Sequence, residues 1–251
     1  PTPSAATLRT HQNVVVDGHF DIGIATDGDA DRIGVIDDTG RFLHPNEILV
    51  LLYYYLEKYK GKKGPAVRNI CTTCVLDEVA ASFGETCYEV PVGFKHISSK
   101  MNETDALIGG ESSGGLTVRG HIKGKDGIYA AMLLVEMITV TGKKLSQIIR
   151  EIESLYGQIH MEENDYHFSQ EKKEEIQKLL MEEKALPELP YEIEKVSYLD
   201  GSKVYFRDGG WVIARFSGTE PLLRIFSEMK NPSDAQNVCR IYEDFLGLTS
   251  R

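Results

Sequence analysis

The sequence predicts an α/β protein that ends in a small α+β domain, and two patterns carry this prediction. Before about residue 153, strand-like and helix-like stretches alternate at the spacing of βαβ units, which is typical of a largely parallel sheet. After it, strand-like stretches follow one another through short DG and DGG turns that suit hairpins. At 251 residues, the chain is long enough for roughly two domains with cores of their own.

The first region is predicted element by element from its apolar runs. Residues 14–37 hold two β-branched runs on either side of an acidic loop, and these runs predict strands. Asn46, with an acid directly after it, predicts the N-cap of the next helix. The elements that follow are a helix over 46–60, a strand over 67–73, a helix over 76–84, a strand over 86–93, a helix over 94–103, a strand over 105–110 and a helix over 127–142.

The second region begins with a solvated amphipathic helix and continues as strands joined by turns. Ser233 is predicted as the N-cap of a last helix that closes this region. Strands that meet in hairpins, with helices gathered separately, indicate an α+β arrangement. The predicted elements are a helix over 169–184, strands over 191–201, 202–209, 210–216 and 222–229, and a helix over 233–248.

Composition narrows the classes of partner. The net charge of -10 argues against nucleic acid, although a small anionic substrate needs only a local basic pocket. No apolar run approaches the ~20 residues of a membrane span, and no signal peptide is recognisable. The four cysteines are too few and too scattered for a disulfide framework, so we expect a reducing, cytoplasmic location. We interpret Cys71 and Cys74 as small residues at a strand end, because a zinc site would need a second such pair.

The acidic loop carries the strongest chemical signal. Asp27, Asp29 and Asp31 alternate with small residues, and in an extended backbone such side chains point the same way. Three carboxylates at one point repel each other unless a cation lies among them. Hard oxygen ligands favour Mg²⁺, with Ca²⁺ or Mn²⁺ as alternatives.

Three interpretations compete for this acidic loop besides the resemblance described below. An EF-hand is excluded, because Arg32 and Asp38 stand where that loop needs glycine and glutamate. A phosphatase of the haloacid dehalogenase type also has Asp-x-Asp after a strand, but usually continues to Thr or Val where this chain has Asp31. An acidic surface turn is the third interpretation.

Three motifs together resemble the α-D-phosphohexomutases, the family of phosphoglucomutase and phosphomannomutase. "TDGDADR" at 26–32 resembles the metal-binding loop of the family, and "IGGESSGG" at 108–115 resembles its sugar-binding loop. "ARFSGTEP" at 214–221 resembles the loop that holds the phosphate that is not reacting. The motifs occur in the order that the family has.

The resemblance implies roles for particular residues. Lys95, within a segment similar to the one beside the reacting phosphate, would stabilise charge on the phosphoryl group, and Arg32 is assigned to catalysis with it. The metal ligands would be Asp27, Asp29 and Asp31, and the substrate-binding residues would be Glu111, Ser113, Arg215, Ser217, Gly218 and Thr219.

Two neighbouring features qualify this assignment. Some members of the family have a histidine where this chain has Gly115, so the general base stays unassigned. Downstream, a basic hairpin that includes His121 and Lys125 suits an anionic ligand, and Asp126 resembles the N-cap of the next helix.

The resemblance also implies a domain organisation and a reaction. The chain would comprise the end of a second α/β domain (1–39, with the metal loop), a complete third mixed-sheet α/β domain (40–152, with the sugar loop) and a small α+β fourth domain (153–251). The phosphoserine motif Thr-x-Ser-His-Asn-Pro of the first domain does not occur in the sequence. We therefore expect a fragment that is inactive alone, whose partners are a sugar phosphate and the missing amino-terminal domains of the same enzyme.

The implied reaction interconverts hexose 1-phosphate and hexose 6-phosphate with Mg²⁺ as cofactor. A phosphoserine would give its phosphoryl group to the sugar, and the resulting bisphosphate would turn over and return the other group. Phosphoglucosamine mutase is an alternative within the family. A metal-dependent aspartate-type phosphatase and a non-catalytic sugar-phosphate-binding module are alternatives from other classes.

Overall fold

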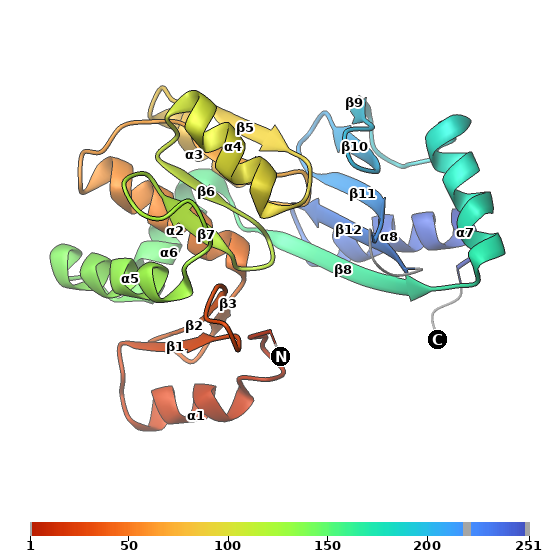
Figure 1. Cartoon of the computed structure of the whole chain (residues 1–251). Helices are drawn as coiled ribbons and strands as arrows, with labels where there is room; N and C mark the ends of the chain where they lie inside the picture. The colour runs from red at the N-terminus through yellow and green to blue at the C-terminus, as the bar shows by residue number, and fades with distance from the viewer. Residues whose placement is uncertain (1, 218–221, 249–251) are drawn as a thin grey trace. The chain divides into compact units, whose positions relative to one another are not determined.

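The structure, a computed structural model, describes residues 2–217 and 222–248 (Figure 1). The chain forms two compact units, Pro1–Gly157 and Gln158–Arg251. Mixed sheets and helices confirm the predicted α/β class, whereas the predicted boundary between residues 39 and 40 stays a prediction. Among the helices of these described ranges, none has the length and apolar character needed to cross a membrane.

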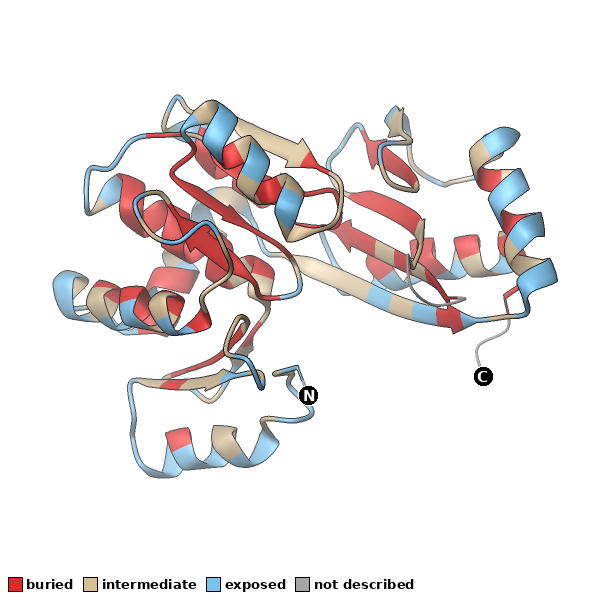
Figure 2. Cartoon of the chain, viewed as in Figure 1, coloured by how far each residue is buried: buried red, intermediate tan, exposed pale blue. Residues whose placement is uncertain are grey.

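The first unit begins with a small antiparallel sheet that carries the acidic loop. Its strands follow the order β1-β2-β3, and β1 pairs with β2 so that Ile24 lies opposite Val35. Every residue of β2 is buried, which fixes this sheet against the rest of the unit (Figure 2). The elements are α1 (Arg9–Asp17), β1 (Ile22–Thr26), β2 (Ile33–Asp37) and β3 (Phe42–Leu43).

Strands β1 and β2 lie on either side of the acidic loop as predicted, but the three valines at the start of the first β-branched run lie in α1 and not in a strand. Only Val15 of the three is buried, at 1% exposure, while Val14 and Val16 are about half exposed. Packing of Val15 beside Gly23 of β1 therefore decides the local structure against the strand preference of valine.

A second sheet forms the body of the first unit and has the order β5-β4-β6-β7. β4 pairs in parallel with β5 and with β6, and β7 is antiparallel to β6, so the sheet is mixed as the fold class required. The strands are β4 (Ala66–Asn69), β5 (Cys87–Val90), β6 (Ile108–Gly110) and β7 (Leu116–Val118), and the helices are α2 (Pro45–Lys58), α3 (Val75–Ser82), α4 (Phe94–Thr104), α5 (Gly127–Thr141) and α6 (Leu145–Tyr156).

Helix α2 is the centre of this unit. Its residues are buried without interruption over 48–57 (Figure 2), because it contacts strands β2 and β6 and also helices α3, α5 and α6. The prediction that Asn46 caps it was wrong. His44 is the cap: its Nδ1 accepts from the Asn46 N–H at 3.2 Å, and its own N–H donates to Glu47 at 2.8 Å. Pro45 favours the first helical position, so the residue before it becomes the cap.

The second unit is a five-stranded antiparallel sheet with helices on one face. Its order is β8-β12-β11-β10-β9, and the predicted hairpins join β9 to β10 and β10 to β11. Alternate residues of β10, β11 and β12, such as Val204, Val212 and Leu223, pack against α8 and the helical segment that follows α7. The elements are β8 (His160–His167), α7 (Gln170–Gln177), a π-helical turn η1 (Lys178–Glu182), β9 (Ile193–Ser197), β10 (Ser202–Phe206), β11 (Trp211–Phe216), β12 (Leu222–Met229) and α8 (Pro232–Leu246).

Asn231, and not Ser233 as predicted, caps helix α8. The Asn231 side-chain oxygen accepts from the Asp234 N–H at 2.9 Å, and Pro232 occupies the first helical position. We expect Asn231→Ala to lower the free energy of unfolding by about 1 kcal/mol, because an orphan N–H loses its acceptor. Ser233→Ala is the control and should cost less, a difference that urea unfolding followed by circular dichroism measures. Equal losses in both variants would contradict Asn231 as the cap.

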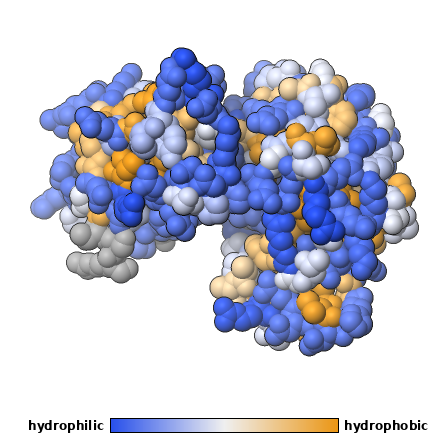
Figure 3. All heavy atoms as spheres, turned by 180° about the vertical axis from the view of Figure 1, so that it is seen from behind, coloured by the Kyte–Doolittle hydropathy of each residue, from blue (hydrophilic) through white to orange (hydrophobic). Residues whose placement is uncertain are grey.

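The surface is mainly hydrophilic, in keeping with the net charge of -10. Apolar areas are scattered and separated on the face that Figure 3 shows.

Candidate functional site

The acidic loop brings its three carboxylates together by a turn. The Ala30 N–H donates to the carbonyl of Asp27 at 3.2 Å, and Ala30 has a left-handed φ of 58°. The expectation of an extended backbone here was therefore wrong. One oxygen from each of Asp27, Asp29 and Asp31 nevertheless lies within 4.8 Å of the others.

Two backbone contacts hold this loop in place. The Arg32 N–H donates to Asp27 Oδ1 at 3.1 Å, which closes the loop on itself. The N–H of Gly127, the first residue of α5, donates to the Ala30 carbonyl at 2.9 Å. A Cβ at Gly127 would lie 2.8 Å from the Arg32 carbonyl oxygen, so glycine is what lets the helix approach so closely. The carboxylates are thus presented by a backbone that is fixed from two sides.

Two cations compensate the acidic charge. Arg32 Nε lies 3.7 Å from Asp27 Oδ2 and 3.7 Å from Asp31 Oδ1, and the Lys125 ammonium contacts Asp31 Oδ2. Desolvation opposes ionisation of Asp27, but the Arg32 N–H, hydrogen bonding with Asp31 and the charge of Arg32 together lower its pKa. Asp27 is therefore ionised at neutral pH and available as a ligand.

The donor set fits a hard divalent cation. It offers carboxylate oxygens only, from one partly exposed loop, and such oxygens are what Mg²⁺, Mn²⁺ and Ca²⁺ prefer. Asp29 is the exposed member, whereas Asp27 and Asp31 are half-buried and held by neighbours. Asp27, Asp29 and Asp31 are therefore the described residues that would hold such an ion.

Glu111 connects three loops at one edge of the mixed sheet. It is 8% exposed, and its Oε1 accepts from Asn69 Nδ2 at 3.2 Å and from the Gly93 N–H at 3.0 Å. Asn69 ends β4, Gly93 follows β5 and Glu111 follows β6, so all three stand at the carboxyl ends of parallel strands. That edge is where open α/β sheets bind ligands.

Thr72 continues this network into the neighbouring loop. Its hydroxyl donates to Asn69 Oδ1 at 2.8 Å and accepts from the Ser112 N–H at 3.1 Å. Cys71 also donates its N–H to Asn69, and the cysteine pair is reduced, so these residues shape the loop after β4. Sequence reasoning missed Asn69 and Thr72, although a polar pair at the end of a buried strand was a usable signal.

The sugar-loop motif is joined to the acidic loop through the backbone. Arg32 and Gly115 form an antiparallel bridge, and the Ile33 N–H donates to the Gly114 carbonyl at 3.3 Å. A Cβ at Gly115 would overlap the stem of Lys125, so a side chain at this position would have to displace that stem. The structure thus brings the metal-loop and sugar-loop motifs side by side.

Ser113 and Lys95 are exposed residues near this edge. Ser113 lies at the tip of the loop after β6, and Lys95 lies in the first turn of α4, directly after the segment that Glu111 holds. Among the described residues, none is in hydrogen-bond or ion-pair contact with the side chain of either. Both side chains are therefore available to a ligand.

The hairpin after β7 is tied to the start of α5. His121 Nε2 and Asp126 Oδ2 are 2.8 Å apart, and the His121 ring stacks on the Tyr129 ring with 3.8 Å between centroids. Asp126 Oδ1 accepts from the Tyr129 N–H at 2.8 Å, which confirms Asp126 as the N-cap. The Tyr129 N–H and then His121 lower the pKa of Asp126, so this carboxylate stays charged.

In the second unit, the described part of the phosphate-loop motif is Arg215 with Ser217. Arg215 Nε donates to Asp200 Oδ2 at 2.9 Å, and the Ser217 N–H donates to the Leu222 carbonyl at 2.8 Å across the loop. The predicted residues Gly218 and Thr219 lie outside the described residues. Asp200 was missed, because the DG dipeptide was interpreted only as a turn.

Arg215 also lies directly opposite Arg224 in the register of β11 and β12. Two like charges at such a position are unfavourable unless each has a partner. Arg224 Nε lies 3.5 Å from Asp165 Oδ1, as Arg215 lies beside Asp200. Each arginine therefore has its own carboxylate, and the pair places two guanidinium groups, which can bind an anion, at the strand ends beside the loop.

Comparison with known proteins identifies similar sequences and folds. Residues 44–156 match the family model described as "Phosphoglucomutase/phosphomannomutase, alpha/beta/alpha domain III", and residues 170–241 match "Phosphoglucomutase/phosphomannomutase, C-terminal domain". A phosphoglucomutase/phosphomannomutase of Thermococcus kodakarensis is 32% identical over 94% of this chain and 49% of its own length. A probable phosphoglucosamine mutase of Methanopyrus kandleri is 31% identical over 100% of this chain and 52% of its own length.

A solved structure shows the same fold. The crystal structure of a putative phosphomannomutase from Thermus thermophilus superposes with a TM-score of 0.80 at 29% identity, over 98% of this chain and 51% of that one. The chain thus spans about half the length of the relatives it matches.

Proposed function

Because the chain belongs to the phosphoglucomutase/phosphomannomutase family, we propose that it is the part of a phosphohexomutase that holds the divalent cation and the sugar phosphate. The complete enzyme would interconvert hexose 1-phosphate and hexose 6-phosphate through a phosphoserine and a bisphosphorylated sugar. The observation that carries the proposal is the meeting of three carboxylates beside the sugar-loop motif, with a backbone bridge between Arg32 and Gly115.

The acidic loop supplies the electrostatic part of the proposal. Asp27, Asp29 and Asp31 would hold Mg²⁺, and a bound Mg²⁺ would neutralise charge that develops on the transferring phosphoryl group. Arg32 adds a positive charge that is held in place, because its Nε lies 3.7 Å from two carboxylates and its Nη1 donates to the Thr2 hydroxyl at 3.1 Å. Lys95 would supply a second, mobile charge from the first turn of α4.

The sugar and its second phosphate would be held by separate groups. Glu111 Oε1 is occupied by Asn69 and Gly93, and among the described residues none donates to Oε2, which leaves an acceptor for ring hydroxyls. Ser113 would add a hydroxyl beside it. Arg215 and Ser217 of the second unit, with Gly218 and Thr219, would bind the phosphate that does not react.

We expect no catalytic turnover by this chain alone. The motif Thr-x-Ser-His-Asn-Pro is absent from the 251 residues, so the phosphoryl group that starts the cycle would come from a serine outside them. Incubation with glucose 1-phosphate, Mg²⁺ and a trace of glucose 1,6-bisphosphate should yield no glucose 6-phosphate at enzymatic rates. Release of inorganic phosphate would instead support a phosphatase.

The identity of the sugar is a choice between related substrates. The glutamate and serine of the sugar loop favour glucose or mannose phosphates, whereas the name of the Methanopyrus kandleri relative keeps glucosamine phosphate as the second candidate. Calorimetric titration of the chain with glucose, mannose and glucosamine 6-phosphates in the presence of Mg²⁺ separates them. Binding of none of the three would count against the proposal.

Asp29 tests the metal site most directly, because it is exposed and does not hold the loop together. We expect Asp29→Asn to weaken Mn²⁺ binding about tenfold or more, since a charged ligand of three is lost. Asp21→Asn, with the same charge change at an exposed position before β1, should stay within about twofold. Titration of the chain with Mn²⁺, followed by electron paramagnetic resonance, measures both. Equal weakening by the two variants would mean that only net charge matters.

A further inference from the structure

Lys125 reaches from the start of helix α5 into the acidic loop. Its ammonium contacts Asp31 Oδ2, and the side chains of the two residues are only 20% and 25% exposed. The next residue, Asp126, is fixed as the cap of α5 and by its N–H, which donates to the Leu116 carbonyl at 3.2 Å. The contact is therefore made by a side chain whose backbone is held by the residue that follows it.

The aliphatic part of the Lys125 side chain packs against the backbone of the sugar loop. A Cβ at Gly115 would overlap Cγ and Cδ of Lys125, so the stem lies directly on the backbone of this glycine. Gly115 is in turn the partner of Arg32 in the bridge between the two loops. The Lys125 side chain thus crosses the sugar loop at Gly115 before its ammonium contacts Asp31.

The charges around Asp31 favour either the contact with Lys125 or a bound divalent cation, but not both at once. Three carboxylates lie within 4.8 Å, and their compensating groups are Arg32 at 3.7 Å and the Lys125 ammonium. A divalent cation bound to Asp31 would stand within a few ångströms of that ammonium, and like charges at this distance repel strongly. The divalent cation and the Lys125 ammonium would therefore compete for the Asp31 carboxylate.

We propose that Lys125 is an internal counter-ion that stabilises the metal-free acidic loop and competes with the divalent cation for Asp31. This inference rests on the proposed metal site and adds a residue to it. It gives Lys125 two opposite effects, because the same contact that stabilises the loop without metal opposes metal binding. A lysine with a purely structural role would not have this pair of effects.

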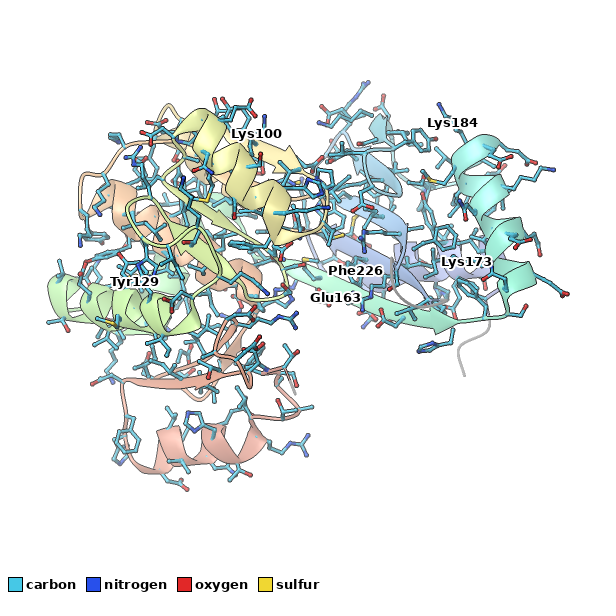
Figure 4. The ribbon with its side chains drawn as sticks, in the orientation of Figure 1. Lys100, Tyr129, Glu163, Lys173, Lys184 and Phe226 are labelled. Carbon is cyan, nitrogen blue, oxygen red and sulfur yellow. The ribbon has the colours of Figure 1, made fainter. Side chains whose placement is uncertain are left out.

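The test is a titration of the whole chain with Mn²⁺, together with thermal unfolding in the absence of metal. Lys125→Met should raise the affinity for Mn²⁺ about 3- to 10-fold and lower the melting temperature of the metal-free chain. Lys100→Met is the matched control: Lys100 pairs with Glu103 at 2.7 Å on α4 (Figure 4) and should leave the Mn²⁺ affinity unchanged. Gly115→Ala is a second route, because its methyl group displaces the Lys125 stem and should also raise the affinity.

The outcomes separate this inference from the proposed function. If the chain binds Mn²⁺ and Asp29→Asn weakens it, but Lys125→Met and Gly115→Ala bind no tighter, the metal site stands and the role of Lys125 is wrong. If neither the original chain nor Lys125→Met binds Mn²⁺, the metal site itself is wrong, and the inference falls with it. Tighter binding in both Lys125→Met and Gly115→Ala supports both.

Discussion

Asp77→Ala is expected to lower the free energy of unfolding by about 2–4 kcal/mol, because it leaves a buried guanidinium without its main partner. Arg68 of β4 is 3% exposed and donates to Asp77 through Nε at 2.5 Å and Nη2 at 3.0 Å. Glu89 of β5, which accepts from Nη1 at 2.6 Å, is the carboxylate that remains. Glu89, with the long contacts of Arg68 to the Asn69 carbonyl and to Cys74 Sγ at 3.4 Å each, cannot satisfy all five donors of the buried guanidinium.

The matched control is Glu78→Ala on the same helix. Both acids stand in the first turn of α3, so both variants lose the same favourable interaction with the helix dipole. Glu78 is exposed and should cost about 1 kcal/mol or less. Urea unfolding followed by circular dichroism measures the difference. Losses of the same size in the two variants would mean that water replaces Asp77 at Arg68.

Glu111→Gln is expected to weaken sugar-phosphate binding about tenfold or more while leaving the fold intact. Its amide oxygen can still accept from Asn69 and Gly93, so the connection of the three loops survives. The second carboxylate oxygen becomes a donor, and a site built to accept from a hydroxyl then presents the wrong group. Calorimetric titration with glucose 6-phosphate measures the loss of affinity.

Glu111→Ala supplies the comparison that separates binding from structure. It removes both acceptors and leaves the Gly93 N–H and the Asn69 amide unsatisfied, at about 1–3 kcal/mol for each group that stays buried. We expect this variant to lose stability as well as affinity, whereas Glu111→Gln loses affinity alone. If Glu111→Gln binds the sugar phosphate as the original chain does, Glu111 serves only to connect the loops.

Much of the fold was predictable because apolar pattern and burial agree over most of the elements. The run over 48–57 is buried all round, and the hairpins of the second unit have the turn residues that such turns need. Strand β8 was missed because its residues are mainly polar and only Tyr166 of its eight is buried. It exists because all eight residues pair with β12, which no local pattern reveals. Helix α6 and the three-residue strand β7 were not predicted either.

The candidate site was also predictable only in part from the sequence. The three aspartates of the acidic loop and Glu111 lie in short sequence motifs. The residue types and spacing of these motifs predict oxygen ligands beside a glycine-rich backbone. Their partners come from distant segments: Lys125 meets Asp31, Asn69 meets Glu111, and Asp200 meets Arg215. Such pairings depend on how elements pack, so only the folded chain identifies them.

The bridge between Arg32 and Gly115 has a consequence for motion. The bridge and the hydrogen bond from the Ile33 N–H to the Gly114 carbonyl join the backbones of the acidic and sugar loops, so we expect the two loops to move together. In the proposed cycle, a doubly phosphorylated sugar must present first one end and then the other. The sugar bisphosphate itself would then reorient, while the two joined loops keep their geometry.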